Sequence, residues 1–344
     1  MSRRSATNAL ADGLHGRRPP ASDWMALIEA ANRALVTPAL LEALASEDVP
    51  DEVAAFMGMV AARNDDRNRR LRTMVLDATA LLNAAGLTPI YLKGMAVWAA
   101  CRPERDSCPR MMSDVDLLVG PDETERALEA LSAGGFKILD RHATHRHEVA
   151  DLWREGEVGV LDLHRRPPGP PALGALFNRD VDTAPAPWPG AARIPSPTHQ
   201  VYLLCLHDMF HDGGFWRGGF DVRHLCDIAE LARHPEGVDW DRLMSLPRTR
   251  LARNAVLSQL VAAHRIAAAP VPARLLRGVI PRLHHRRHEA QQLRPSLELP
   301  LALLGIGLEG LNLRQHWPHL APAGTTAFEL LWGLAQRRVY PNKI

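Results

Sequence analysis

The sequence predicts an α+β protein in which a small mixed β-sheet core lies between a helical N-terminal region and an all-α C-terminal domain. Short apolar runs typical of strands recur between residues 88 and 164, whereas helical periodicity dominates before and after them. The segment 167–197 is rich in Pro, Gly and Ala, which predicts a linker or an irregular crossing between the two patterns. The length of 344 residues is enough for two or three domains.

We expect four parts along the chain. Residues 1–20 are polar and basic and predict a disordered tail. Residues 21–64 form the helical N-terminal region, residues 65–185 the core, and residues 186–344 the helical C-terminal domain.

Helix signals are clear in the N-terminal region. Ser22-Asp23 offers an N-cap to a first helix, and a second helical stretch covers residues 39–46. A long helix begins at Asp51 and ends before Gly86, which suits a C-terminal cap. The polar run Arg63–Arg70 inside it is either a solvated face or a break.

The core alternates short strands with two helices. One helix covers residues 94–100, and a second opens at Pro121, with acids in its first turn, and ends at Gly134. The expected strands are residues 88–92, 114–119, 136–139, 144–151 and 158–164.

The C-terminal domain is predicted to be helical throughout. Its expected helices are residues 197–211, 219–233, 239–246, 250–268, 285–295, 299–313 and 324–338.

Composition gives no sign of a nucleic-acid or membrane partner. Hydrophobic residues make up 46% and charged residues 23%, and the net charge is +2. The most apolar late run, residues 301–308, is too short to span a bilayer. Lysine occurs only at Lys93, Lys137 and Lys343, which draws attention to Lys93.

The cysteines predict a reducing compartment. Cys101, Cys108, Cys205 and Cys226 show no CxxC spacing, so they fit neither a zinc site nor a disulfide framework. The N-terminus lacks the apolar segment of a signal peptide, and we expect a cytoplasmic protein.

The stretch 87–119 carries the chemistry. Lys93-Gly94 closes one strand and opens a helix, whose free N–H groups can bind a phosphate. Asp114 and Asp116 alternate along the next strand, so both carboxylates point to one face. Adjacent carboxylates repel unless a cation lies between them. The stretch therefore predicts a divalent metal beside a phosphate.

Three sequence words resemble one known family. They are Tyr-Leu-Lys-Gly at 91–94, Arg-Met-Met-Ser-Asp-Val-Asp at 110–116 and Val-Leu-Asp-Leu-His at 160–164. Their order resembles the nucleotidyltransferase superfamily typified by the polymerase β palm. It is most similar to a bacterial family of uncharacterised nucleotidyltransferases, the fifth NTP-transferase family, over residues 65–270.

The resemblance implies transfer of an NMP from an NTP to a hydroxyl or similar acceptor on a small molecule, peptide or protein, with release of pyrophosphate. Asp114 and Asp116 would hold one Mg²⁺ or Mn²⁺ ion. Asp162 would help to hold a second ion and would accept the acceptor's proton. This assignment requires the three carboxylates to converge within metal-binding reach.

The resemblance also implies a nucleotide-binding set. Lys93, Gly94 and Arg110 would bind the β and γ phosphates of the NTP, with Ser113 and His164 beside them. The wider superfamily has Gly-Ser at the start of this helix, whereas Gly94 is followed by Met95.

Three other functions compete with this one. A relative without catalytic activity could bind a nucleotide or a partner. A glycosyltransferase could use the Asp-x-Asp motif to hold its metal, but it would need a longer nucleotide-binding unit before the motif. A toxin-like transferase acting on RNA ends would need a basic groove, which the net charge does not favour.

The remaining polar residues have plainer interpretations. Asp114 and Asp116 could be an exposed pair at a loop mouth, and His164 could be a structural histidine. His207 and His211 have the i, i+4 spacing of zinc ligands, but Asp208 stands where the zincin motif has glutamate, so we expect a polar seam along the cleft.

Two more groups of histidines, and one acid, are expected to be structural. His142, His145 and His147 are predicted to be surface or strand residues, and Asp227 either to order the polar seam or to cap a helix. The basic run 284–288 is expected to be a solvated helix face.

Overall fold

The structure is a computed structural model, and it confirms the predicted α+β class. It describes residues 3–17, 24–44, 49–144, 146–169, 176, 178–305 and 307–309. Three predicted features lie outside these residues: the Ser22-Asp23 cap, the side chain of His145 and the helix at 324–338.

Most of the described helices precede or follow the strands of one sheet, and α5 and α6 lie between those strands. The α-helices are α1 (Arg3–Leu14), α2 (Trp24–Arg33), α3 (Thr37–Ala43), α4 (Asp51–Ala84), α5 (Lys93–Cys101), α6 (Thr124–Ala133), α7 (Pro197–Leu206), α8 (Gly214–Arg217), α9 (Val222–Arg233), α10 (Trp240–Ser245), α11 (Arg250–Ala267), α12 (Ala273–Leu276) and α13 (Val279–Leu293). Short 3₁₀ turns are η3 (Pro121–Glu123), η5 (Asn178–Asp180) and η7 (Pro295–Leu297), and η6 (His207–His211) is a π-helical turn.

The strands form one mixed sheet in the order β3-β4-β5-β2-β1-β7-β6. They are β1 (Ile90–Tyr91), β2 (Asp114–Leu118), β3 (Lys137–Arg141), β4 (Glu148–Trp153), β5 (Val160–His164), β6 (Thr183–Pro185) and β7 (Arg193–Pro195). The central strand β2 is parallel to β5 and antiparallel to β1. Strand β2 is therefore hydrogen-bonded on both sides, and this pairing fixes the positions of its side chains.

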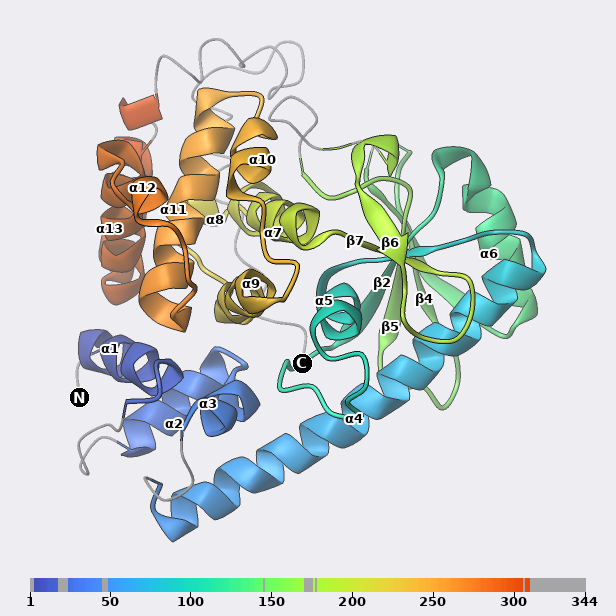
Figure 1. Cartoon of the computed structure of the whole chain (residues 1–344), viewed down its shortest axis with the longest axis horizontal. Coiled ribbons are helices and arrows are strands. Elements are labelled where there is room, and N and C mark those ends of the chain that lie inside the picture. Colours follow the sequence, from blue (N-terminus) through green and yellow to red (C-terminus); the bar gives the residue numbers. More distant parts are fainter. Residues whose placement is uncertain are drawn as a thin grey trace.

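One face of the sheet packs on α4 and α6. Leu71, Met74, Val75 and Ala78 recur on one side of α4 and are fully buried with strand residues such as Leu117. Burying a large aliphatic side chain contributes roughly 1.5–3 kcal/mol. This helical period therefore fixes α4 beneath the sheet, as Figure 1 shows.

The opposite face packs on the C-terminal helices. Leu92 and Leu118 share an apolar core with α7, α9, α10 and α11. Figure 1 shows these helices beside α5, on the side away from α6. Polar side chains of β2 that point the same way as Leu118 therefore face the junction between the sheet and the helical domain.

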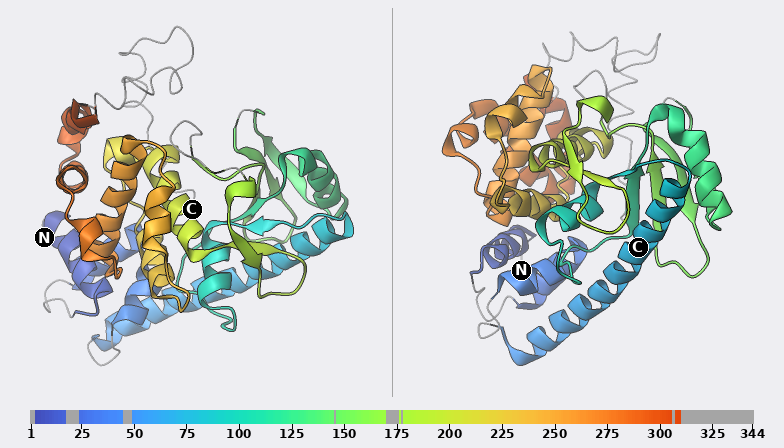
Figure 2. Two further views of the ribbon diagram at one scale, coloured as in Figure 1. Left: turned by 45° about the horizontal axis from the view of Figure 1, so that its top comes forward. Right: turned by 45° about the vertical axis from the view of Figure 1, so that its right-hand side comes forward.

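Helix α4 connects the N-terminal helices to the sheet. It is 34 residues long and continuous, so the polar run Arg63–Arg70 is not a break. Its first turns bury Val53 and Met57 against α1, α2 and α3, whereas its later turns lie under the sheet. Figure 2 shows it running from one part to the other in both views.

Two predictions about the chain's connections are wrong. Residues 3–14 form α1 and not a disordered tail, because Ala9 and Leu10 pack against Leu27 and Leu40. The segment 167–197 is more than a linker, since β6 and β7 lie within it and extend the sheet beyond residue 185. Each of these strands has three residues, which is too short to show a strand period in the sequence.

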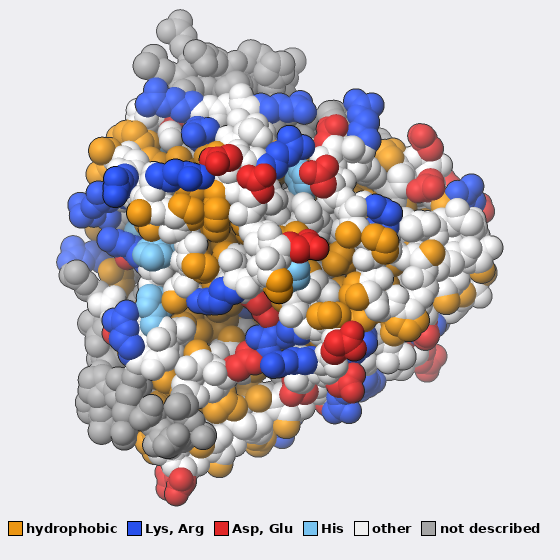
Figure 3. All heavy atoms as spheres, viewed as in Figure 1, with side chains coloured by type: hydrophobic (Ala, Val, Ile, Leu, Met, Phe, Trp, Pro, Cys, Tyr) orange, Lys and Arg blue, Asp and Glu red, His pale blue; other side chains and the backbone are white. Residues whose placement is uncertain are grey.

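The surface carries charges of both signs. Lys and Arg side chains lie among Asp and Glu side chains over the face in Figure 3. Among the described residues, no helix has the length and apolar character needed to cross a membrane.

Candidate functional site

Strand register brings two of the predicted acids side by side. In the parallel pair β2–β5, Asp116 lies opposite Asp162, and Leu118 lies opposite His164. Asp114 is two residues before Asp116 and so points to the same face. These polar side chains share the face of Leu118, which is turned toward the C-terminal helices.

Asp116 is buried and has two partners from different elements. Its Oδ1 is 2.7 Å from Lys93 Nζ and 2.9 Å from His164 Nε2. Burial raises the pKa of the Asp116 carboxyl, but the Lys93 charge and the His164 contact outweigh it and hold the pKa well below its usual range. Asp116 is therefore ionised at neutral pH.

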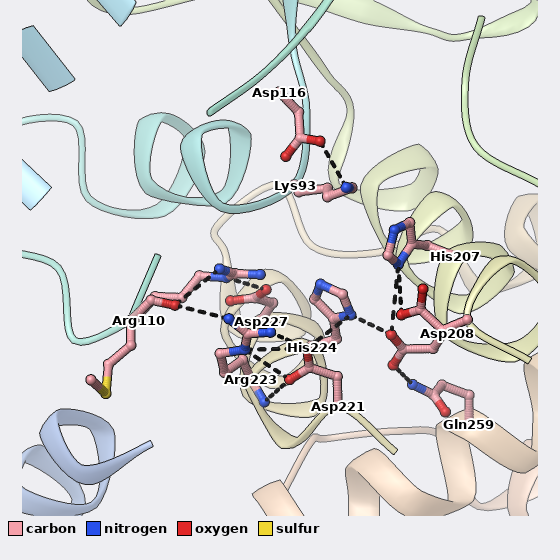
Figure 4. A network of polar contacts seen from close by, with 12 residues as sticks. Lys93, Arg110, Asp116, His207, Asp208, Asp221, Arg223, His224, Asp227 and Gln259 are labelled. Carbon is pink, nitrogen blue, oxygen red and sulfur yellow. Dashed lines mark hydrogen bonds and ion pairs between the residues drawn. The ribbon is translucent and has the colours of Figure 1, made fainter. Parts of the chain in front are cut away.

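Lys93 lies at the start of α5 with its ammonium among the acids. Its backbone φ is 46°, a left-handed conformation that is uncommon for a residue with a side chain. Burial lowers the pKa of Lys93, but the charges of Asp116, Asp114 and Asp162 raise it above its usual value. Figure 4 shows this side chain pointing at Asp116. The chain itself thus supplies one cation on the face that carries the three carboxylates.

Asp162 and Asp114 lack an ion pair of the kind that Lys93 makes with Asp116. Neither has a hydrogen bond or ion pair with a side chain that the structure describes. Burial, and then the charges of Asp116 and Asp114, raise the pKa of Asp162 to about 8. Three facing carboxylates with a single ammonium leave excess negative charge, which a further cation would neutralise.

The three aspartates fit a magnesium ion in donor type and in their shared face. Hard oxygen ligands of this kind are those that Mg²⁺ prefers. As the side chains stand, however, Asp114, Asp116 and Asp162 are not among the groups of described residues whose ligand atoms lie within 4.8 Å of one another. The strands place the three residues on one face, but the carboxylates as they stand, one of them held by Lys93, do not show the convergence that the assignment requires.

Gly94 allows the start of α5 to lie close to the side chains of Met112 and Arg110. A Cβ at this position would lie 2.6 Å from Met112 Sδ and 3.0 Å from a terminal nitrogen of Arg110. The N-cap residue Leu92 provides no side-chain hydrogen bond, so the first N–H groups of this nine-residue helix have no side-chain cap. Such N–H groups suit a phosphate.

Arg110 faces the helical domain and not the acids. Its Nε donates to Asp227 Oδ2 on α9 over 2.7 Å, and both side chains are buried. Figure 4 shows this pair beside Arg223, whose guanidinium donates to the carbonyl of Met111. Arg110 therefore joins the loop before β2 to α9. Asp227 was expected to order the histidine seam or to cap a helix, but its partner here is Arg110, a pairing that the sequence did not suggest.

Helix α4 also fixes the loop before β2, through side-chain hydrogen bonds to the carbonyl groups of that loop. The amides of Asn64 and Asn68 donate to the carbonyl of Cys108 over 2.8 and 2.9 Å, and Asn68 also donates to Arg110. Arg67 Nε donates to Met112, and another of its nitrogens to Ser113, which stands directly before β2. These positioning residues were not predicted. Their signal was the i, i+3, i+4 spacing of Asn64, Arg67 and Asn68 within the polar run Arg63–Arg70.

A row of histidine side chains leads from the site of Asp114, Asp116 and Asp162, here called the acid site, into the helical domain. The ring of His164 stacks on His147 at 5.4 Å, and His147 meets His211 edge to face at 4.7 Å. His211 lies 4.9 Å from His207, whose ring is 5.6 Å from His224. The expected polar seam along η6 therefore exists, and His147 belongs to it instead of being a plain strand residue.

The acids around this seam set the charges of its histidines. Asp208 accepts hydrogen bonds from His224 and from Gln259 in α11, and Figure 4 shows His207 turned toward it. Burial and Lys93 lower the pKa of His207, but Asp212 and Asp208 raise it to about 9. Burial and the charge of His207 lower the pKa of His211 to about 3.

The prediction that residues 284–288 are a solvated face is wrong. His284, Arg287 and His288 are buried, and Arg287 and His288 hydrogen-bond to the carbonyl of Phe215. Residues 284–288 were predicted to be solvated because their carbonyl partners on α8 lie about seventy residues away in the sequence.

The cavity next to Lys93 is small. It measures about 10 Å³ and is lined by residues that include Leu92, Val97 and Gln200. A larger cavity of about 540 Å³ lies on the other side of the seam, where Asp208 and Asp212 face α1 and α2. A third, of about 280 Å³, adjoins Arg110 and Asp227.

A family model matches most of the chain. The model of a family described as uncharacterised nucleotidyltransferase matches residues 20–268, which include the acids, Lys93 and the seam. No curated protein matches the chain.

Proposed function

The chain belongs to this family of uncharacterised nucleotidyltransferases, and on that premise we propose that it transfers an NMP from an NTP to a hydroxyl or similar acceptor and releases pyrophosphate. The observation that carries the proposal is the pairing of Asp116 with Asp162 on parallel strands, beside the start of α5. Family membership favours this reaction over glycosyl transfer.

Asp114, Asp116 and Asp162 would hold Mg²⁺ in this proposal. The ion supplies charge neutralisation to the phosphates and the leaving pyrophosphate. Lys93 keeps Asp116 ionised and oriented through its 2.7 Å contact, and its ammonium adds positive charge near the phosphates. The uncapped N–H groups of α5 would donate hydrogen bonds to the phosphate oxygens.

Asp162 is the proposed proton acceptor. It makes no hydrogen bond or ion pair with the other described side chains, and Mg²⁺ at the site would offset the acids that raise its pKa to about 8, so its ionised oxygens would be available to an acceptor hydroxyl. Asp116 is less suitable, because Lys93 and His164 already occupy one of its oxygens. The small molecule, peptide or protein that provides the hydroxyl is the open part of the proposal.

The direct test is label transfer. The purified chain is incubated with each NTP labelled at the α-phosphate, with Mg²⁺ and a cell extract as the source of acceptors. We expect labelled product and pyrophosphate with the wild type, and a loss of at least about 100-fold in Asp116→Asn and Asp162→Asn. Asp140→Asn is the matched control, since Asp140 is an exposed aspartate on the edge strand β3.

A relative without catalytic activity is the second candidate. Two observations favour it, the ammonium of Lys93 among the carboxylates and the cavity of about 10 Å³ beside it. Calorimetry with each NTP and Mg²⁺ separates the two candidates. Nucleotide binding without transfer or pyrophosphate release supports the second, and the absence of both binding and transfer contradicts the first.

A further inference from the structure

A second cluster of metal-ligand types lies where β4 begins, next to the π-helical turn η6. One ligand atom each of His147, Glu148 and His211 lies within 4.8 Å of the other two. The first two residues belong to the sheet layer, and His211 belongs to the helical domain. None of the three is among the acids proposed to hold magnesium.

The spacing of these atoms is close to that of ligands around one ion. Glu148 Oε1 is 3.6 Å from His211 Nε2 and 3.7 Å from His147 Nε2. Both distances are too long for hydrogen bonds. Two atoms that each bind a tetrahedral ion at about 2.1 Å lie roughly 3.4 Å apart. The rings of His147 and His211 cross at 88°, so both can present a nitrogen to the same point.

A buried nitrogen points independently to a ligand. His147 exposes 8% of its surface, and its Nε2 is buried without a hydrogen-bond partner among the described residues. Leaving such a group unsatisfied costs about 1–3 kcal/mol. The other oxygen of Glu148, Oε2, is 2.5 Å from Arg146, which leaves Oε1 directed at the two histidines.

The ligand types and the local backbone narrow the choice of ion. Two imidazoles and one carboxylate suit zinc and similar transition metals, whereas Mg²⁺ prefers oxygen ligands alone. Single π-helical turns occur frequently at functional sites. The other histidine of the turn is His207. Its Nδ1 is 3.3 Å from Asp212 Oδ2, and this contact holds its side chain at Asp212. The His211 side chain is 29% exposed, so an ion can reach the cluster from solvent.

We propose that His147, Glu148 and His211 bind a zinc-class transition metal ion that fastens β4 to η6. The ion would tie the sheet to the helical domain next to the acid site, because His147 stacks on His164 and His164 contacts Asp116. Three protein ligands leave one tetrahedral position for water or for a substrate group.

The test uses the full chain after removal of metals with a chelator. Zn²⁺ alone is titrated in competition with a chromophoric chelator, and Co²⁺ absorption reports the ligand geometry. We expect one zinc ion per chain, a tetrahedral Co²⁺ spectrum and a higher melting temperature with zinc. His147→Gln and His211→Gln should each weaken zinc binding by more than about 100-fold, beyond the 10–100-fold effect typical of outer partners.

Two controls make the result specific. His234→Gln removes a histidine outside the cluster and should leave zinc affinity unchanged. Asp116→Asn should also bind zinc normally, so failure of the proposed transferase activity and failure of this site are separate outcomes. Glu148→Gln provides a third ligand variant if a histidine variant does not fold, which circular dichroism detects.

Three results would overturn the proposal. The first is a wild type that binds no zinc at micromolar concentration. The second is normal zinc binding in both histidine variants. The third is loss of zinc in His207→Gln or Asp116→Asn with normal binding in His147→Gln, which would assign the ion to other residues.

Discussion

Lys93 combines a buried charge with a strained backbone. Its φ of 46° directs the chain from β1 into α5, and its ammonium neutralises Asp116. Strained residues of this kind persist where the surrounding structure fixes them, and they cluster at functional sites. The two properties can be separated by substitution.

Lys93→Ala should lower the free energy of unfolding by about 3–5 kcal/mol, because it leaves Asp116 buried without its cation. Lys93→Gly loses the same charge but tolerates the positive φ, so it should be about 1 kcal/mol more stable than Lys93→Ala. Urea unfolding measures both. Ala268→Gly is the matched control for backbone strain alone, since Ala268 has a φ of 53° and should gain stability.

Equal stability of the Gly and Ala variants at position 93, while Ala268→Gly is stabilised, would show that Lys93 carries no backbone strain.

His288 predicts how stability depends on pH. Burial, and then the charge of Arg287, lower the pKa of His288 well below its usual value of 6.5. Below about pH 6.5, His288 therefore binds a proton in the unfolded chain but stays unprotonated in the folded chain. The resulting stability is present above pH 6.5 and is lost as the pH falls, by up to about 1.4 kcal/mol per pH unit for one group.

We expect His288→Gln to have a shallower loss of unfolding free energy than the wild type between pH 6.5 and 5. The slope is the readout, because the lost contacts of His288 lower stability at every pH. Parallel curves for the two proteins would contradict the assignment.

At the scale of elements, the ion pair between Arg110 and Asp227 joins two parts of the fold. It connects the loop before β2 to α9, and both side chains are buried. Breaking one partner of a buried pair leaves an uncompensated charge, whereas removing both does not. The geometry of this loop then depends on the helical domain.

Arg110→Met and Asp227→Leu should each cost about 3–5 kcal/mol of unfolding free energy, and the double variant should cost clearly less than their sum. A double-mutant cycle by urea unfolding measures this coupling. Additive costs would indicate that the two side chains do not stabilise each other.

Local patterns predicted the elements that carry the acids. The period of two in strands was enough to place Asp114 and Asp116 on one face, and the Val-Leu-Asp word placed Asp162 on a neighbouring strand. The contact of Lys93 with Asp116 follows from adjacency of β1 and β2.

Long-range partners explain what the sequence could not show. Arg110 was expected at a phosphate, but Asp227 lies far along the chain and no local pattern links the two. The same applies to Asn68, which supports the loop before β2, and to the buried run 284–288. Burial of a polar residue depends on a partner that the local sequence does not contain.

At the scale of the whole molecule, the acid site lies at the junction of the sheet and the C-terminal helices, with Asp114 and Asp162 partly exposed. The cavity of about 10 Å³ beside Lys93 is lined by none of the three aspartates, and it is far smaller than the several hundred Å³ typical of ligand pockets. A nucleotide that occupied the space beside Lys93 would therefore have to separate the sheet from the C-terminal helices.

Hydrogen exchange can detect this separation. Addition of ATP and Mg²⁺ should speed exchange of the buried amides in α7, which packs against Leu92 and Leu118. Asp116→Asn should show no change, because it would not bind the metal–nucleotide pair. Slower exchange in α7 of the wild type would show that the nucleotide binds without opening.

The pairing of β1 with β7 has a consequence for synthesis of the chain. Ile90 pairs with Arg193, about a hundred residues later, so this edge of β1 stays open until β7 has left the ribosome. Helices α7 and α9, which cover Lys93 and hold Arg110, emerge later still. A nascent chain thus exposes an unpaired edge of β1 until β7 pairs with it, and it exposes Lys93 and Arg110 until the C-terminal helices dock.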